Sequence, residues 1–403
     1  MPAEPDVSDL ISVEQACAVI DAVAVEPRLA KVALGEAAGY VLAEDILADR
    51  DYPPFEKSLM DGFAVAAADV AIAAPFRVIG EIAAGRRPAR DIQAGETMAI
   101  MTGAMLPAGA DAVIPIEYAR RDGAAVLFTQ TTQPGKAVQH RGAELPAGAR
   151  VLSRGTVLGP AQLAAAATVG VARLSVYRRP TAFVLATGDE VVSVRSRPPP
   201  QKIRNANNIL LASLLKNLGV DVAGESHAPD DRRRLESSIR AGMKQDIIFI
   251  SGGMSMGQYD FAPQALKSLG FDLRITKVRI RPGKPFVFGV HPDGTFAFGL
   301  PGNPLAAYVC ALRLAARLIR RLTGLPAEPK WTAAALAAPV EANGPREFYQ
   351  PAIRNPGGAV TPLKWKGSAD VFSLAHADTL IIRPENDPPR AAGEIVRLLE
   401  IPS

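Results

Sequence analysis

The alternation of apolar and polar positions is most regular between residues 179 and 325. Here short apolar runs typical of buried strands alternate with longer segments in which apolar residues recur at helical spacing. The pattern predicts strands at residues 182–186, 220–223, 247–250 and 286–289, and helices at 209–218, 231–243, 262–269 and 304–322. Strands that alternate with helices are typical of a doubly wound α/β domain, which binds ligands at the carboxyl ends of its strands.

The segments on either side follow other patterns. Helices are predicted at residues 12–23, with Ser12 as the N-cap, and at 162–169, an alanine-rich stretch that ends before Gly170. Between them, β-like runs at 76–82, 97–101, 112–118 and 125–128 are separated by Gly and Pro turns, which favours a small, mainly β module. After a linker at 326–330, short strands predict a small C-terminal β barrel or sandwich.

The composition indicates a globular protein of several domains and argues against some classes of function. The 403 residues exceed what one core normally supports, and 48% of them are apolar, so we expect a globular chain of several domains. The net charge is only +4, without a clustered basic face and stacking aromatics, which argues against nucleic-acid binding. Cys17 and Cys310 lack metal or redox spacing and are predicted to be buried thiols in a reducing compartment.

Nothing in the sequence predicts export or membrane insertion. The first ten residues carry Glu4, Asp6 and Asp9 where a signal peptide would need positive charge. No apolar run reaches membrane-spanning length without Arg or Lys. We therefore expect a cytoplasmic protein that does not bind membranes.

Three Gly- and Pro-containing loops at 251–261, 281–285 and 300–304 interrupt the α/β pattern. In the first loop Gly252 and Gly253 allow backbone amides to approach an anion, Ser255 adds a hydroxyl group and Asp260 adds a carboxylate. Carboxylate oxygens are the ligands that Mg²⁺ prefers beside phosphate. One such loop would be explained by turn geometry, but three in one region predict a site for a phosphate-bearing small molecule.

Other carboxylates have structural explanations as well as functional ones. Asp61 precedes Gly62, and an ordinary Asp-Gly turn explains it when it is taken alone. Glu190 follows a predicted strand, where it would face the ligand crevice. Asp230 and Asp231 precede a helix, and one of them is expected to cap it.

Cations gather near the second loop. Lys277, Arg279 and Arg281 alternate with apolar residues, so a strand would project all three to one face, although a solvated face explains this pattern equally well. Lys284 in the following turn favours an anion site. The four histidines are scattered and none is assigned to a metal.

Six ordered segments, at 58–65, 101–104, 186–190, 251–261, 281–285 and 300–304, resemble the motifs of the molybdopterin molybdotransferases, the MoeA and gephyrin E-domain family. The resemblance covers nearly the whole chain. It implies insertion of molybdenum into adenylylated molybdopterin, with molybdate and Mg²⁺ as co-reactants and AMP as product. It also implies a homodimer whose active site lies between the α/β domain of one subunit and a smaller domain of its partner.

The pattern and the resemblance together predict a multidomain α/β plus β fold. Its parts are a helical and β bridging domain at 1–54 with 141–178, a small mainly β lid domain at 55–140, a doubly wound molybdopterin-binding α/β domain at 179–325 and a C-terminal β barrel at 326–403.

The resemblance assigns roles to residues that occupy the family's motif positions. The residues expected to be catalytic are Asp61, Glu190, Asp230, Asp260, Lys277 and Arg281. Those expected to bind substrate are Thr102, Gly252, Gly253, Ser255, Lys284, Pro301, Asn303, Arg346 and Ser368. Asp260, Glu190 and Asp61 are expected to position Mg²⁺.

Three positions depart from the family pattern. Arg281 stands where Lys is common, Ala306 where Ser is common, and Asn205 where an acid is often found. The alternative of a molybdopterin-binding scaffold with weakened activity stays open, although the presence of Asp61, Glu190 and Asp260 favours an enzyme. A generic nucleotide-sugar or dinucleotide enzyme lacks support, because no Gly-x-Gly-x-x-Gly motif follows a strand. The choice between molybdate and tungstate is not encoded in any motif.

Overall fold

The computed structural model describes residues 10–254 and 261–402, which form two compact units. Unit 1 comprises the described residues of 1–31, 39–43 and 175–403, and unit 2 comprises 32–38 and 44–174. No helix in the described part of the chain is both long and apolar enough to cross a membrane.

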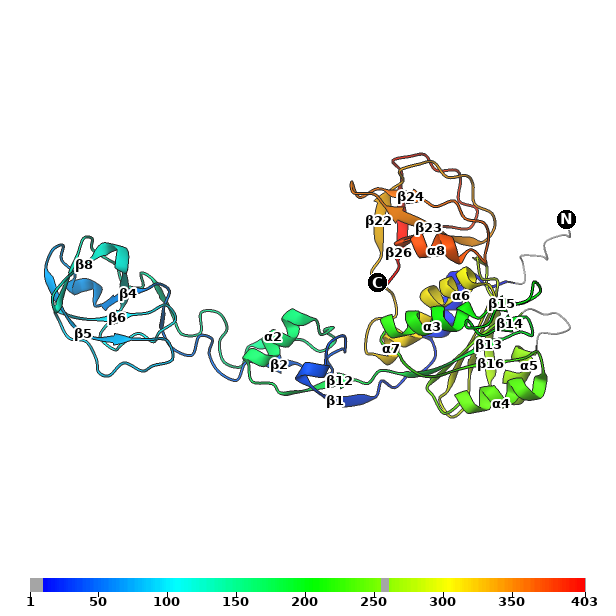
Figure 1. Cartoon of the computed structure of the whole chain (residues 1–403), viewed down its shortest axis with the longest axis horizontal. Helices are drawn as coiled ribbons and strands as arrows, with labels where there is room; N and C mark the ends of the chain where they lie inside the picture. Colours follow the sequence, from blue (N-terminus) through cyan, green and yellow to red (C-terminus); the bar gives the residue numbers. More distant parts are fainter. Residues whose placement is uncertain (1–9, 255–260, 403) are drawn as a thin grey trace. The chain divides into compact units, whose positions relative to one another are not determined.

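The elements of unit 1 follow the predicted alternation (Figure 1). Its helices are α1 (Val13–Asp21), α3 (Ala206–Asn217), α4 (Arg232–Gly242), α5 (Ala262–Ser268), α6 (Pro304–Cys310), α7 (Ala316–Leu322) and α8 (Val371–His376). Its first group of strands is β13 (Thr181–Thr187), β14 (Val191–Val192), β15 (Ile203–Arg204), β16 (Asp221–Ala228), β17 (Ile247–Ser251), β18 (Asp272–Lys277), β19 (Ile280–Arg281), β20 (Pro285–Val290) and β21 (Phe296–Leu300). The later strands are β22 (Thr332–Ala335), β23 (Glu347–Arg354), β24 (Val360–Pro362), β25 (Thr379–Arg383) and β26 (Ile395–Glu400).

A six-stranded sheet in the order β16-β13-β17-β21-β20-β18 forms the centre of unit 1. The strands β16, β13, β17 and β21 run parallel, and β20 and β18 run antiparallel to their neighbours. Ile247 and Phe249 of β17 pack into a core with α1, α3, α6 and α7, whereas Ile248 and Ile250 pack into a core with α4 and α5. Because both faces are covered, the strand is apolar from Ile247 to Ile250 and turns polar only at its last residue, Ser251, and the covered faces confirm the doubly wound prediction.

The long helix predicted at 304–322 is continuous but not uniform. It consists of α6, a π-helical segment at Ala311–Ala315 and α7. The predicted strand through Lys277, Arg279 and Arg281 is wrong as a single element. The chain bends at Arg279, so that β18 joins the α/β sheet while β19 pairs with β23.

The last part of unit 1 is a second, C-terminal sheet in the order β19-β23-β25-β26-β22, with β24 also paired to β23. Just after β22, Leu336 bridges to Val360 of β24, so the sheet returns on itself. Leu336, Val360, Ile381 and Leu398 are buried in one cluster inside it. This closure makes the element a small barrel rather than a sandwich.

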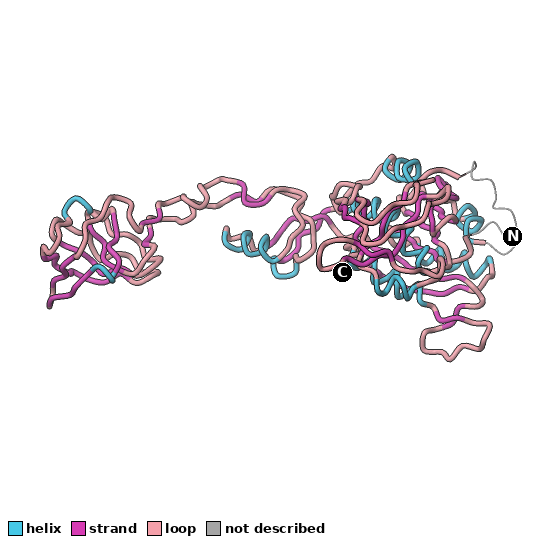
Figure 2. The backbone as a smooth tube through the Cα atoms, turned by 90° about the horizontal axis from the view of Figure 1, so that it is seen from above, coloured by secondary structure: helices cyan, strands magenta, loops and turns pink. Residues whose placement is uncertain are grey.

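Unit 2 is mainly β, as the spacing of its apolar runs predicts (Figure 2). Its strands are β2 (Ile46–Leu47), β3 (Lys57–Ser58), β4 (Gly62–Val65), β5 (Pro75–Ile82), β6 (Glu96–Ile100), β7 (Ala112–Pro115), β8 (Ala119–Asp122), β9 (Ala125–Phe128), β10 (Val138–Gln139) and β11 (Arg150–Leu152). They are followed by α2 (Pro160–Thr168). The largest sheet has the order β7-β4-β6-β5-β9-β8.

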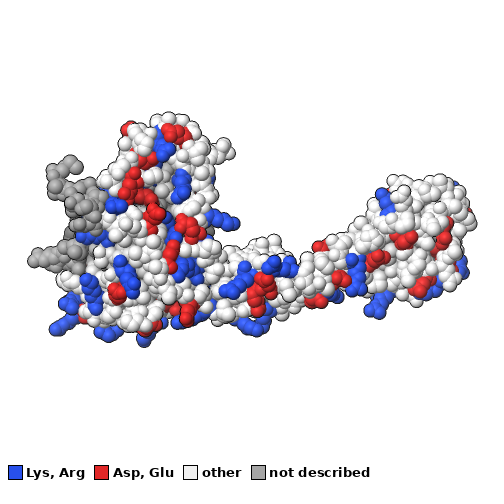
Figure 3. All heavy atoms as spheres, turned by 180° about the vertical axis from the view of Figure 1, so that it is seen from behind, with Lys and Arg blue, Asp and Glu red and all other residues white. Residues whose placement is uncertain are grey.

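The chain passes from one unit to the other within β1 (Leu29–Ala33), after residues 38 and 43, and within β12 (Arg173–Tyr177). The described fold is thus multidomain α/β plus β, in agreement with the sequence, while the exact four-domain boundaries stay a prediction. Basic and acidic residues are intermingled on the face drawn in Figure 3.

Candidate active site

The loops that follow β13 and β16 meet beside each other because these strands are parallel neighbours. The backbone N–H of Asp230 donates to Asp189 Oδ1 at 3.1 Å, and the N–H of Asp189 donates to Asp230 Oδ2 at 3.4 Å. Asp231 caps α4 by accepting from the Arg234 N–H at 2.9 Å. The expectation that one of the two neighbouring acids caps the helix is confirmed, and Asp230 is the acid left beside the loop of Glu190.

The loop after β17 requires glycine for a steric reason. Gly252 and Gly253 have φ values of +94° and +62°, in the left-handed region that favours glycine. A Cβ atom on Gly252 would lie 2.7 Å from the carbonyl oxygen of Thr187, so the chain approaches β13 too closely for a side chain. The backbone path of this half-buried loop is therefore set by packing against Thr187.

Polar side chains lie unsatisfied where these loops and the start of α3 meet. The hydroxyl groups of Thr187 and Ser251 and the side-chain carbonyl oxygens of Asn207 and Asn208 are buried and have no hydrogen-bond partner among the described residues. Such groups are costly unless a ligand or water completes them. The sequence reasoning did not select Thr187, Asn207 or Asn208, and their place at a strand end and a helix start is the signal that could have found them.

The loop at 281–285 is held against α6. Gly283 has φ +130°, and a Cβ there would lie 2.4 Å from Sγ of Cys310. Cys310 is fully buried, and burial raises the pKa of its thiol, so it is a packing residue. The contact fixes the turn that carries Arg281 and Lys284.

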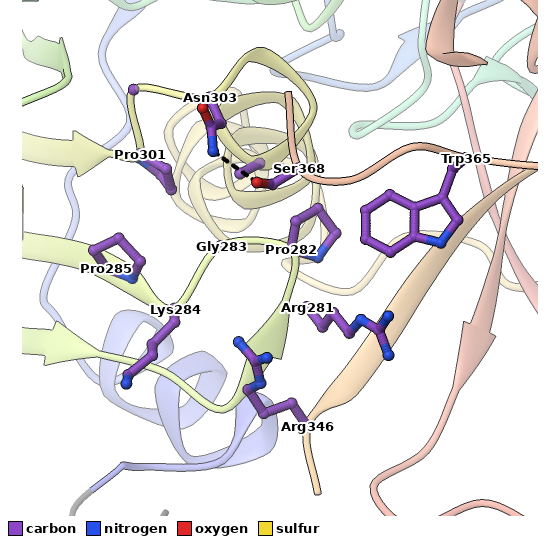
Figure 4. A pocket seen from close by; sticks show the side chains of 12 residues that line it. Arg281, Pro282, Gly283, Lys284, Pro285, Pro301, Asn303, Arg346, Trp365 and Ser368 are labelled. Atoms are coloured by element: carbon purple, nitrogen blue, oxygen red, sulfur yellow. Dashed lines mark hydrogen bonds between the residues drawn. The ribbon is translucent and has the colours of Figure 1, made fainter. Parts of the chain in front are cut away.

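The cationic cavity, of about 390 Å³, opens at the junction of the α/β sheet and the C-terminal barrel (Figure 4). It is lined by Arg281, Pro282, Gly283, Lys284, Pro285, Pro301, Gly302, Asn303, Ala306, Arg346, Trp365 and Ser368. Asn303 Nδ2 donates to Ser368 Oγ at 2.6 Å and thereby ties the start of α6 to the barrel. Three cations and no carboxylate line this cavity among the residues that the structure describes, so it favours an anion.

The acidic cavity, of about 270 Å³, adjoins the cationic cavity through the shared residues Pro285, Pro301 and Gly302. Its other lining residues are Thr187, Gly188, Glu190, Asp230, Gly252, Gly253 and Met254. The structure thus brings Glu190, Asp230 and the glycine loop to one place, and Lys284, Arg281, Arg346 and Ser368 to the adjoining one.

Not every expected residue lines these cavities. Lys277 ends β18 and lines neither of them. Ser255 and Asp260 lie outside the described residues. Trp365 lines the cationic cavity although the sequence reasoning did not select it, and Pro301, which was expected to bind substrate, lines both cavities.

In unit 2, Asp61 and Thr102 lie together. Asp61 Oδ1 accepts from the Thr102 N–H at 2.6 Å and from the Thr102 hydroxyl group at 2.8 Å. These two hydrogen bonds, the backbone one foremost, lower the pKa of Asp61 below its usual value. Thr102 thus holds the Asp61 carboxylate in place and favours its ionised form.

The donor set of the acidic cavity suits a hard cation. Within residues 10–254 and 261–402 no group of three or more His, Cys, Asp or Glu side chains could hold a metal ion alone. Mg²⁺ is commonly held by one or two carboxylates together with substrate phosphates, and Glu190 and Asp230 supply two carboxylates. The residues present therefore fit Mg²⁺ that arrives with a phosphate-bearing substrate.

Comparison with known proteins gives consecutive family matches along the chain. Residues 11–170 match the MoeA N-terminal region (domains I and II), residues 183–321 a probable molybdopterin binding domain, and residues 333–401 the MoeA C-terminal region (domain IV).

Two curated relatives are named molybdopterin molybdenumtransferase. The one from Nostoc sp. is 32% identical over 92% of this chain and 88% of its own length. The one from Staphylococcus epidermidis is 31% identical over 96% of this chain and 95% of its own. A solved structure described as a molybdopterin biosynthesis MoeA protein from Pyrococcus horikoshii matches with a TM-score of 0.83 at 30% identity, covering 97% of this chain and 99% of that one. The chain therefore belongs to the MoeA family of molybdopterin molybdenumtransferases, enzymes of molybdenum cofactor biosynthesis.

Proposed function

We propose that this chain transfers molybdenum from molybdate to adenylylated molybdopterin, in a Mg²⁺-dependent reaction that releases AMP. The observation that carries the proposal is the pair of adjoining cavities. One has three cations and no described carboxylate in its lining, and the other combines a glycine loop with two carboxylates. A dianion and a phosphate-bearing substrate could be held side by side there in spite of their mutual repulsion.

The cationic cavity is the proposed molybdate site. Lys284 comes from the α/β loop, Arg346 from the barrel and Arg281 from β19, and all three line the cavity, with the Arg281 side chain extending toward Trp365 (Figure 4). Fixed cations stabilise the tetrahedral dianion, and the hydroxyl group of Ser368 adds a donor. Asn303 orients that hydroxyl group through its hydrogen bond.

The acidic cavity is the proposed place of the phosphate end of the pterin substrate. Gly252 and Gly253 would present backbone amides there, and Pro301 shapes the wall shared with the molybdate site. Ser255, which lies outside the described residues, is proposed to bind substrate on the family resemblance alone. Glu190 and Asp230 are the proposed carboxylates of this cavity, and Asp260, outside the described residues, is proposed as a further carboxylate on the family resemblance. Bound Mg²⁺ would supply positive charge that stabilises the departing phosphate oxygens.

Residues outside both cavities complete the proposal. Lys277, the last residue of β18, is proposed to be a catalytic residue. We also propose a homodimer in which Asp61 and Thr102 serve the active site of the partner subunit, with Asp61 positioning metal or attacking oxygen. The family resemblance of the segments 58–65 and 101–104 supports this assignment, and the low pKa of Asp61 suits it, because an ionised carboxylate is what a metal-binding role requires.

The test is AMP release by the purified chain incubated with adenylylated molybdopterin, Mg²⁺ and molybdate. We expect release that requires both the oxyanion and Mg²⁺, and a loss of at least about a hundredfold in Glu190→Gln. Asp260→Ala is expected to lose metal-dependent release as well. Binding of the pterin without oxyanion-dependent AMP release would identify a scaffold and refute the proposal.

A further inference from the structure

Arg281 is held by two aromatic rings of the C-terminal barrel. Its guanidinium carbon lies 4.6 Å from the ring centroid of Phe348 and 5.3 Å from that of Trp365. The two ring centroids are 5.1 Å apart, with an angle of 38° between the ring planes. Phe348 and Trp365 therefore form an aromatic corner around the guanidinium group, at distances where cation–π attraction is effective.

Strand pairing fixes this arrangement. Arg281 and Phe348 are direct partners in the parallel register of β19 and β23, so Phe348 lies beside Arg281 in the sheet. Phe348 is buried, and Trp365 reaches the same group from the loop after β24 (Figure 4). The position of the Arg281 side chain is thus set by the barrel, although the residue belongs to the 281–285 loop.

One ring of this corner, Trp365, stands at the wall of the cationic cavity, whereas Phe348 lines a second cavity that also includes Arg281. Trp365 and Arg281 both line the cationic cavity, together with Lys284 and Arg346. A planar guanidinium group can stack on a ring and still direct N–H groups past its edge, whereas a lysine ammonium group has no plane to stack. The ring contacts therefore fix the direction of a forked donor at the edge of the anion site.

We propose that Trp365 and Phe348 are positioning residues that orient the Arg281 guanidinium group toward the tetrahedral oxyanion. This inference rests on the proposed function. The rings act through Arg281 and do not bind the oxyanion themselves. Removing a ring should weaken oxyanion binding only while Arg281 is present.

The experiment is a double-mutant cycle on molybdate binding to the full-length chain, measured by titration calorimetry with molybdate as the only ligand. Trp365→Leu is expected to weaken binding by about three- to tenfold, and Trp365→Phe, which keeps an aromatic face, to retain most of it. Adding Trp365→Leu to Arg281→Met should cause no further loss. Phe348→Leu provides the same test on the other ring if Trp365→Leu does not fold.

Trp331 supplies a matched control. It also stacks with arginines, Arg313 and Arg397, each at 5.1 Å, but does not line the cationic cavity. Trp331→Leu should leave molybdate binding unchanged. In the AMP-release assay, Trp365→Leu should raise the KM for molybdate and leave the KM for the pterin substrate unchanged, a split that general unfolding would not produce.

Three outcomes would overturn the inference. Unchanged molybdate binding in both ring variants would remove the positioning role and leave the proposed function intact. An equal loss from Trp365→Leu with and without Arg281 would mean that the ring contacts the ligand directly. Absence of saturable molybdate binding by the unmodified chain would refute the proposed function and the inference together.

Discussion

At the scale of single residues, Ala306 is the departure from the family pattern with the clearest chemical consequence. Its side chain lines the cationic cavity near Ser368, whose carbonyl oxygen accepts from the Ala306 N–H at 3.3 Å. A hydroxyl group at this position would add one donor to the anion site, worth about 1 kcal/mol. We expect Ala306→Ser to tighten molybdate binding by about fivefold, measured by titration calorimetry.

A matched change checks this prediction. Ala307 follows in the same helix and is buried without lining the cavity. Ala307→Ser should leave molybdate affinity unchanged, even if it lowers stability. If Ala306→Ser has no effect or weakens binding, the oxyanion does not approach the start of α6.

Thr102 controls the ionisation of Asp61. Its backbone N–H and hydroxyl group both stabilise the carboxylate, which lowers the pKa of Asp61. Thr102→Val removes only the hydroxyl donor, so the pKa of Asp61 should rise part of the way toward its usual value. A ¹³C NMR titration of the Asp61 carboxyl group measures this change.

Thr129→Val is the control, because the Thr129 hydroxyl group donates instead to the carbonyl oxygen of Tyr118. It should not move the pKa of Asp61. An unchanged Asp61 titration in Thr102→Val would show that the hydroxyl contact is not maintained in solution.

At the scale of elements, Glu96 joins β6 to β5 and to the loop between them. Arg90 donates to its two carboxylate oxygens at 2.6 and 2.9 Å, and Arg77 also pairs with it. The bonds from Arg90 are the largest influence. Burial alone would raise the pKa of Glu96. The hydrogen bonds from Arg90, Arg77 and the Gln93 N–H together outweigh this effect and lower the pKa of Glu96 to about 2.

The sign of the pH dependence follows from this shift. The folded-state pKa lies below the usual value of 4.5, so the ionised group stabilises the fold above about pH 4.5. That stabilisation is lost as the pH falls from 4.5 toward 2. We expect Glu96→Gln to lower amide hydrogen-exchange protection in β5 and β6 at pH 6, with a deficit that shrinks as pH 3 is approached.

Glu81→Gln on the exposed side of β5 is the matched substitution, and it should not show this convergence. A deficit in Glu96→Gln that stays constant between pH 6 and 3 would mean that the ion pairs do not contribute through the ionised carboxylate.

Most elements could be predicted from the sequence where local pattern and tertiary environment agree. The apolar run at 247–250 predicts β17 because both of its faces are buried. The break between β18 and β19 could not be predicted, since Val278 and Ile280 are buried whether the strand lies in one sheet or two. The break arises from partners far along the chain, where Arg279 pairs with Glu385 and Ile280 with Glu347.

The same reasoning explains which parts of the candidate site were found. Glycine and proline mark loops at strand ends, so Gly252, Gly253 and Lys284 are visible in the sequence. Arg346 and Ser368 follow no such pattern and were selected only through the family resemblance. Trp365 was not selected, because an isolated tryptophan in a β region is usually a core residue and its contact with Arg281 depends on the barrel pairing.

At the scale of the whole molecule, the cationic cavity uses two parts of unit 1 at once. Arg281, Lys284 and Asn303 come from the α/β loops, while Arg346 and Ser368 come from the barrel. Neither part alone carries all three cations. The direct bond between Asn303 and Ser368 and the pairing of β19 with β23 hold the two parts in register. The cationic cavity is therefore a property of the assembled unit.

The homodimer proposal adds that one active site takes its residues from two different subunits. Complementation between inactive variants can test this. Asp61→Ala changes unit 2 and Lys284→Met changes unit 1, and each variant alone should be inactive in AMP release. If the proposed site takes its two sets of residues from different subunits, a mixed dimer contains one site that carries both substitutions and one that carries neither. Random exchange of equal amounts should then restore about a quarter of the unmodified activity.

The pairing of variants decides between the possible arrangements. Lys284→Met mixed with Glu190→Gln should restore nothing, because both residues lie in unit 1 and every site of a mixed dimer then carries one of the two substitutions. If the active site were instead formed within one chain, the mixture of Asp61→Ala and Lys284→Met would also stay inactive, since every subunit carries a defect. Subunit exchange must be verified by mass spectrometry of the mixed dimers, so that lack of recovery in an exchanged sample counts directly against a site shared between subunits.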